Sequence, residues 1–192
     1  LGEKLLVQGA VPTVERWLDQ LPEAVRAAEP HAAYLRGTCA WLRWDWARAR
    51  PELSRAVAGL TEPAELPQRI RASFQLVDAL NSSGDPAAAL ERLEQVGALP
   101  LDAVGQAELA LQRAWCVAPG GRPEEVARLM REFVSLAARD PARVCPPTAP
   151  RIHCTLVGLR GIAATFEQYG ALAQATFGAR PSPWHIAALA VH

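Results

Sequence analysis

The sequence predicts an all-α fold in which helical hairpins stack into a solenoid. Ala and Leu dominate its 192 residues and β-branched runs are scarce, which favours helices over strands. Apolar residues recur every three or four positions almost throughout, as on one face of a helix. Pro, Gly, Asp and Asn interrupt this pattern at short intervals. A pattern of turns and small residues also repeats along the chain, and this third observation indicates stacked hairpins.

The interruptions divide the first 140 residues into short amphipathic helices. Three of the predicted starts place proline in the first turn, at Pro22, Pro86 and Pro123, where its missing N–H costs no hydrogen bond. After a proline-rich connection, VCPPTAPR, we expect one or two helices within 152–176 and a new start at Pro183. The earlier candidates are 13–21, 22–28, 31–43, 46–59, 66–82, 86–97, 102–117 and 123–138.

Three segments repeat the same turn: WDWARARPELSRAV from Trp44, GDPAAALERLEQV from Gly84 and GRPEEVARLMREF from Gly121. These starts are 40 and then 37 residues apart. Compact residues recur at the same offsets, on the second helix of each pair and in the middle of the first. They are Ala49, Ala89 and Val126 on the second helices and Gly37, Val77 and Ala114 on the first.

Small residues at these positions let the two helices of a hairpin approach closely. One hairpin cannot bury both of its apolar faces, so hairpins are expected to stack. The alternative is an antiparallel bundle whose Ala-rich helices imitate a repeat. We predict one repeat domain over 1–192, with repeats at about 31–59, 66–97, 102–138 and 148–177. The initial Leu suggests a fragment of a longer protein.

The small-residue pattern resembles tetratricopeptide repeats, which wind as right-handed superhelices. The start of the chain carries a more specific pattern than this repeat. The pattern W-L-x-x-L-P at Trp17 to Pro22 is followed by a short helix, and Pro30 then introduces a long helix. This order resembles the sensor region of MalT-like LuxR-type transcriptional activators, and ARPSPWHIAALAVH resembles a later repeat start in that family. Trp44 departs from the pattern because it stands where the repeat usually has Gly, and Pro51 interrupts a second helix.

The resemblance implies a modular activator in which this repeat array is the cytoplasmic sensor. It would bind a small-molecule inducer or a regulatory protein, and the full-length protein could self-associate. It also implies an N-terminal P-loop ATPase module and a C-terminal helix-turn-helix domain that binds DNA. Neither module is in this sequence, since no P-loop and no basic recognition helix occur here. The alternative is a stand-alone repeat scaffold that binds a peptide or partner protein.

Composition argues against several other functions. The 20 basic and 20 acidic residues give no net charge, so a footprint for nucleic acid or an anionic membrane is missing. No apolar run is long enough to span a bilayer. Cysteines do not follow metal-site spacing, and we expect reduced thiols, although Cys145, His153 and Cys154 together could hold a metal. Because no catalytic motif occurs, we expect no enzyme activity and no cofactor.

The candidate binding residues lie around the middle of the first helix in each pair. Positions one and four after the compact residue, and three before it, are expected to line the inner face of the solenoid. Aromatic surface beside Asp and Asn would suit a polar or sugar-like ligand, or a peptide. The alternative is that the aromatic residues pack between repeats. Moving one turn earlier adds Arg71 and Glu108. The predicted set is Tyr34, Thr38, Trp41, Arg71, Phe74, Asp78, Asn81, Glu108 and Trp115.

The remaining tryptophans have different expected roles. Trp17 shares the apolar side of its helix with Val14 and Leu18, which predicts a core position. Trp46 should pack back on the preceding helix, and Trp44 should be partly exposed in the turn, where an indole can mark a partner contact. Trp184 would be exposed if its covering repeat were missing. Pro51 predicts a late start or a kink in its helix.

Overall fold

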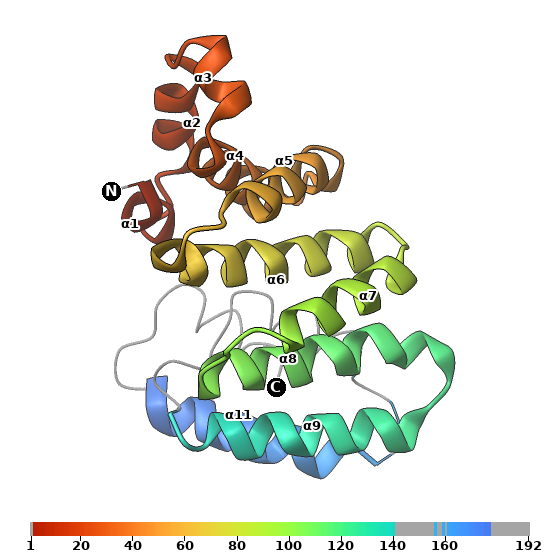
Figure 1. Ribbon diagram of the computed structural model, residues 1–192. Helices are drawn as coiled ribbons and strands as arrows, with labels where there is room; N and C mark the ends of the chain where they lie inside the picture. The colour runs from red at the N-terminus through yellow and green to blue at the C-terminus, as the bar shows by residue number, and fades with distance from the viewer. Residues whose placement is uncertain (1, 141–155, 157–158, 160, 178–192) are drawn as a thin grey trace. The chain divides into compact units, whose positions relative to one another are not determined.

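The computed structural model describes residues 2–140, 156, 159 and 161–177, and every regular element within them is a helix (Figure 1). The all-α prediction is confirmed, while the right-handed superhelix stays a prediction. The chain divides into two compact units, residues 1–92 and 93–192, which we describe separately. The single repeat domain also stays a prediction. The expected helix start at Pro183, Trp184, and the cluster of Cys145, His153 and Cys154 lie outside the described residues.

The first unit contains seven helical elements and the start of an eighth. Three helices begin and end at the predicted residues: α5 (Trp46–Gly59), α6 (Leu66–Ser82) and α7 (Pro86–Gly97), of which α7 continues into the second unit. The first helix, of six residues, was not among the predicted helices. The other elements are α1 (Gly2–Val7), α2 (Val11–Asp19), α3 (Glu23–Ala28), α4 (Pro30–Leu42) and the 3-10 turn η1 (Pro63–Glu65).

Helices α4 and α5 form a tight hairpin that depends on small residues at their contact. A Cβ atom added at Gly37 would lie 2.7 Å from Cγ of Leu53, which is closer than real Cβ contacts come. Ala49 and Leu53 are completely buried on the facing side of α5. Gly37 and Ala49, the predicted compact positions, are therefore both buried in this hairpin, with Gly37 packed against Leu53.

The three predicted turns share an unusual backbone conformation. Trp44, Gly84 and Gly121 have φ angles of +61°, +84° and +68°, all in the left-handed region. In the first two turns an aspartate follows, and its carboxylate caps the next helix. Oδ1 of Asp45 accepts from the backbone N–H of Arg48, and Oδ1 of Asp85 accepts from that of Ala88, both at 3.2 Å. Trp44 thus occupies the glycine position of the repeat.

Pro51 suggested a late start for helix α5, but the helix does not start late. It begins at Trp46, directly after the Asp45 cap, and continues through Pro51 to Gly59. The proline can sit inside the helix because its side chain and that of Ala47 are both exposed. The carbonyl of Ala47, which loses its usual N–H donor four residues later, can therefore bond to water.

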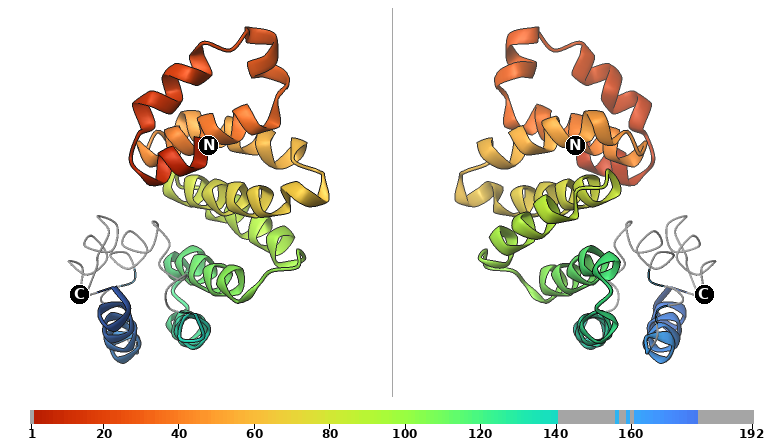
Figure 2. Two further views of the ribbon diagram at one scale, coloured as in Figure 1. Left: turned by 90° about the vertical axis from the view of Figure 1, so that its left-hand side faces the viewer. Right: turned by 90° about the vertical axis from the view of Figure 1, so that its right-hand side faces the viewer.

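The second unit contains the end of α7, then α8 (Ala103–Val117), the 3-10 turn η2 (Ala118–Gly120), α9 (Pro123–Ala137) and α11 (Ala163–Phe177). Helices α8 and α9 form an antiparallel hairpin, and α11 lies beside α9 (Figures 1 and 2). Phe133 of α9 packs on Tyr169 of α11, with ring centroids 5.1 Å apart. Ala114 and Val126, compact positions of the repeat pattern, are completely buried, and so is Met130, one turn after Val126.

Candidate functional site

Most of the predicted binding residues in the first unit lie in a seam between α4 and α6. The indole Nε1 of Trp41 donates a hydrogen bond of 2.5 Å to Oδ2 of Asp78. The hydroxyl of Thr38 lies 2.8 Å from the carbonyl oxygen of Tyr34 and 3.0 Å from Oε1 of Gln75. The two cross-helix pairs are each 37 residues apart, so one helical turn of α4 matches one turn of α6.

The residues of this seam are closed off from solvent. Tyr34, Thr38, Trp41, Phe74 and Asp78 are all buried. The most exposed of them, Phe74, is 8% exposed, and Asp78 has no exposed surface. In this structure they are enclosed and do not present a surface that a ligand could reach. The sequence analysis left packing between repeats open as the alternative to ligand contact. The burial of Tyr34 and Phe74 agrees with that alternative.

Two of the predicted residues extend the seam toward the surface. Arg71 is exposed, and its Nη2 atom lies 2.9 Å from Oε1 of Glu3 on α1. This ion pair joins the end of the seam to the first helix. Burial raises the pKa of the Tyr34 hydroxyl beside it to about 12, so this phenol stays neutral at physiological pH. Asn81, one turn after Asp78, is half-buried.

The other two predicted residues lie on α8 in the second unit. Trp115 is buried, and Glu108 is half-buried with its Oε1 atom 2.8 Å from Nε2 of Gln112. Oε1 of Gln112 is itself buried without a hydrogen-bond donor. The sequence did not single out Gln112, although it stands at the same distance before the compact residue of its helix as Gln75 does.

The exposed tryptophans are not all where the sequence placed them. Trp44 is 63% exposed in its turn, as expected. Trp17 is 44% exposed, so its predicted core position is wrong. The reason is that Val14 and Leu18, one turn apart, take up the buried stripe of α2, and Trp17 lies at the edge of that stripe. Trp46 is half-buried at the start of α5.

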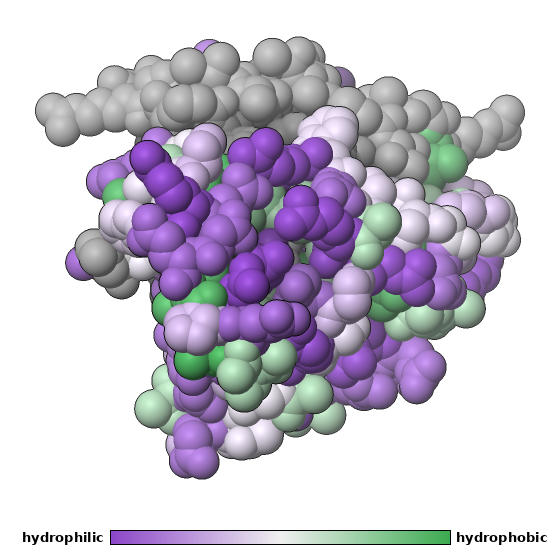
Figure 3. Space-filling model, turned by 90° about the horizontal axis from the view of Figure 1, so that it is seen from above, coloured by the Kyte–Doolittle hydropathy of each residue, from purple (hydrophilic) through white to green (hydrophobic). Residues whose placement is uncertain are grey.

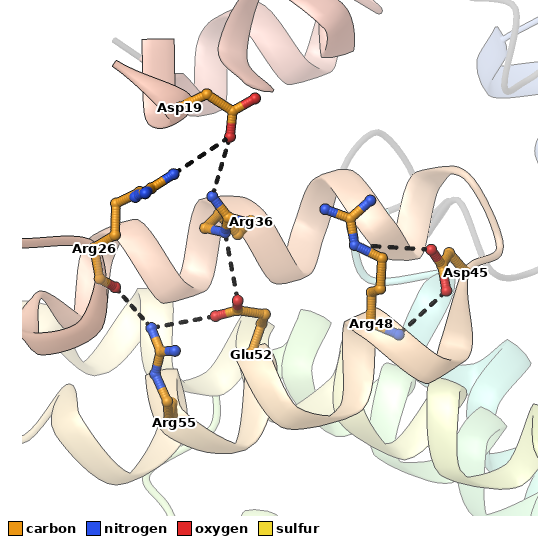
Figure 4. A network of polar contacts seen from close by, with 7 residues as sticks. All are labelled: Asp19, Arg26, Arg36, Asp45, Arg48, Glu52 and Arg55. Atoms are coloured by element: carbon orange, nitrogen blue, oxygen red, sulfur yellow. Dashed lines mark hydrogen bonds and ion pairs between the residues drawn. The ribbon is translucent and has the colours of Figure 1, made fainter. Parts of the chain in front are cut away.

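A network of arginines and carboxylates joins four helices of the first unit (Figure 4). Arg36 of α4 lies 3.3 Å from Asp19 of α2 through Nη1 and 3.4 Å from Glu52 of α5 through Nε. Arg55 of α5 lies 3.2 Å from Glu52 and donates a 2.9 Å hydrogen bond to the carbonyl of Arg26 on α3. These contacts hold α2 and α3 against the α4–α5 hairpin, a role that the sequence analysis missed because the partners are far apart in the chain.

A pocket of about 260 Å³ lies beside this network. Its charged groups all have partners. Arg36 pairs with Asp19, Arg43 pairs with Glu15 at 2.6 Å, and Arg48 pairs with Asp45, outside the lining, at 4.0 Å. Burial raises the pKa of the Cys39 thiol in its wall to about 11, so the thiol is protonated and a poor nucleophile at neutral pH. The complete lining is Glu15, Leu18, Asp19, Arg36, Cys39, Ala40, Arg43 and Arg48.

The polar character of this part of the molecule is visible on its surface. The face in Figure 3 is mostly hydrophilic, with small separate hydrophobic areas. Within the described residues, no three His, Cys, Asp or Glu side chains come together in a way that could hold a metal ion. None of the described helices combines the length and apolarity that crossing a membrane requires.

Comparisons with protein-family models, curated proteins and solved structures give no match to this chain. The resemblance to MalT-like activators is therefore carried by the sequence pattern alone. Any function must be argued from the geometry of the helices and their exposed side chains.

Proposed function

We propose that this chain is a protein-interaction repeat module and that the turn between α4 and α5 is part of its contact surface. The observation that carries this proposal is the conformation of Trp44. A bulky residue with φ of +61° is uncommon and costs about 1 kcal/mol relative to glycine. The equivalent turns have glycine. The backbone conformation alone therefore favours glycine at this position.

The exposure of Trp44 indicates a role in binding, which would offset the cost of its backbone conformation. An indole that is 63% exposed leaves most of its apolar surface in water. Tryptophan and arginine are the residues most enriched among those that dominate binding energy at protein interfaces. Arg43 and Arg48, both exposed, flank the turn on either side. A partner that covers the indole would bury a large apolar area beside two charged groups.

We place this module in a regulator of the MalT-like type, acting in the cytoplasm and without catalytic activity of its own. The order of the first elements supports this assignment: α2, the short α3, and α4 starting at Pro30 follow the family pattern. A bound inducer or regulatory protein would act by preferring one of two arrangements of the array. DNA binding would belong to a domain outside this sequence.

The test replaces Trp44 by a photo-crosslinking amino acid in cells that express the protein. A specific crosslinked partner is expected from position 44 and not from position 17, where the native tryptophan is also exposed. Trp44→Gly should weaken binding of the captured partner, while Trp17→Ala should not. Equal crosslinking from both positions, or full binding by Trp44→Gly, would contradict the proposed surface.

The regulator assignment has its own test. The gene that encodes the chain should also encode a P-loop ATPase module upstream and a helix-turn-helix domain downstream. If the flanking sequence has neither, the stand-alone scaffold is the better description, and the Trp44 surface is still open to the crosslinking test.

A further inference from the structure

The hairpin of α8 and α9 carries a second pocket, of about 380 Å³, which the sequence analysis did not predict. One face of each helix contributes to it, with residues spaced three or four positions apart. A volume of this size lies in the range of small-molecule sites. The lining residues are Gln106, Leu109, Ala110, Arg113, Leu129, Glu132, Ser135, Leu136 and Arg139.

The lining combines apolar and polar groups. Ala110, Leu129 and Leu136 are buried in the hairpin and Leu109 is half-buried, so these four residues form an apolar floor. Ser135 and Gln106 are exposed at the rim and can donate hydrogen bonds to a ligand. Such a surface suits a molecule with an apolar body and polar ends.

The two arginines of this pocket differ from those of the pocket beside Cys39. No hydrogen bond or ion pair joins the guanidinium of Arg113 or Arg139 to any residue in the described part of the chain. The pocket's carboxylate, Glu132, is paired instead with Arg128, at 3.1 Å. Both guanidinium groups therefore keep their donors available for an anion.

The arginines also lie at opposite ends of the pocket. Gln106 and Arg113 are two turns apart on α8, which is about 10 Å. Because α9 runs antiparallel to α8, Arg139, just after the end of α9, lies near the start of α8 and therefore at the Gln106 end. The apolar floor lies between the two positive groups.

Arg113 is held in place by its surroundings. A Cβ atom added at Gly97, the last residue of α7, would lie 3.1 Å from Nη2 of Arg113 and 3.3 Å from Cδ2 of Leu109. The guanidinium thus lies against the bare backbone of Gly97, and it is half-buried. Its position is set before any ligand binds, which lowers the entropy cost of binding.

We propose that this pocket binds an organic dicarboxylate with an apolar chain between its two charged ends. One carboxylate would pair with Arg113 and the other with Arg139. The chain would lie over Leu109, Ala110, Leu129 and Leu136. Glu132, in the middle of the pocket, disfavours an anion there and so favours charges at the ends over a charge at the centre.

The test is a calorimetric titration of the full 192-residue chain with octanedioate, octanoate and octanediol. Octanedioate should bind at least about tenfold more tightly than octanoate, because each charge-assisted pair is expected to contribute at least that factor. Octanediol should bind most weakly. Arg113→Gln and Arg139→Gln should each reduce octanedioate affinity to that of octanoate for the wild-type chain.

Arg131→Gln is the matched control, since Arg131 is an exposed arginine of α9 outside the pocket. It should bind octanedioate like the wild-type chain, and thermal unfolding should show that all three variants fold. Equal affinity for octanedioate and octanediol, no effect of either pocket variant, or no binding would overturn the proposal. Tighter binding of a diglutamyl peptide than of octanedioate would overturn the small-molecule assignment.

Discussion

The indole N–H of Trp41 on α4 donates its hydrogen bond to Asp78 on α6, and both side chains are buried. A carboxylate removed from water is costly unless hydrogen bonds compensate for its lost hydration. The pair therefore joins the two helices in one register. It also explains why a tryptophan and an aspartate that look like binding residues in the sequence are enclosed in the structure.

Trp41→Phe should destabilise the chain by about 1–3 kcal/mol, because it removes a buried donor and leaves the Asp78 carboxylate short of one partner. Urea denaturation measures the change. Asp78→Asn combined with Trp41→Phe completes a double-mutant cycle, in which the two effects should not add. A loss below about 0.3 kcal/mol for Trp41→Phe would show that this bond contributes little.

Ala49→Leu should destabilise by about 1–3 kcal/mol, because the larger side chain cannot fit where α4 and α5 meet. Gly37→Leu should do the same, since even a Cβ at that position comes too close to Leu53. Ala47→Leu is the control, as Ala47 is exposed on the same helix. Thermal unfolding of the three variants provides the measurement. Equal effects at 47 and 49 would disprove the register of the hairpin.

Trp44→Gly should be more stable than Trp44→Ala by about 1 kcal/mol. Both changes remove the indole, so the difference reports only the left-handed backbone, which glycine adopts without a steric cost. Gly84→Ala and Gly121→Ala should lose about the same amount, because their φ angles are also positive. Chemical denaturation of the four variants compares them. If the alanine and glycine variants at 44 are equally stable, the turn has a different conformation in solution.

The raised pKa of Tyr34 predicts that the folded chain loses stability at high pH. Its pKa is raised from 10.0 to about 12 by burial, so in that range the unfolded chain releases the phenol proton more readily than the folded chain. The folded state thus gains nothing from this group below about pH 10 and loses stability as the pH rises from 10 to 12. The loss approaches about 2–3 kcal/mol at the upper end.

Tyr34→Phe should remove this part of the pH dependence. Unfolding free energies at pH 8 and pH 11, measured for both proteins, give the comparison. Absorbance at 295 nm can also follow ionisation directly, since the chain has only 2 tyrosines. An unchanged pH dependence in the variant would mean that Tyr34 ionises normally in the folded chain.

The helices themselves were predictable because their signals are local. Proline at the first positions of α7 and α9, and aspartate before α5 and α7, mark helix starts through the backbone groups of the adjacent turn. Gly84 and Gly121 revealed the turns, and their spacing placed Trp44 at an equivalent position. The left-handed backbone at Trp44 follows from that alignment.

The candidate site was less predictable. Counting along α4 and α6 picked out residues on related faces, and Trp41 with Asp78 and Thr38 with Gln75 do lie on facing sides. The count could not tell an open inner face from a closed seam, because that depends on how closely two neighbouring helices approach. The predicted core position of Trp17 was wrong for a similar reason. Only the helices packed around α2 decide which edge of its apolar stripe is covered.

The sequence by itself determined that the described residues are helical, where most helices begin and end to within about two residues, and which small residues are buried in a hairpin. Periodicity, capping and turn chemistry act over a few residues, so they can be read along the chain. Tertiary structure alone decided that Trp41 is enclosed with Asp78 while Trp44 is exposed. It also decided that Arg36 pairs with two carboxylates while Arg113 has none. Burial and ion pairing depend on groups brought together from distant positions, and no local pattern specifies them.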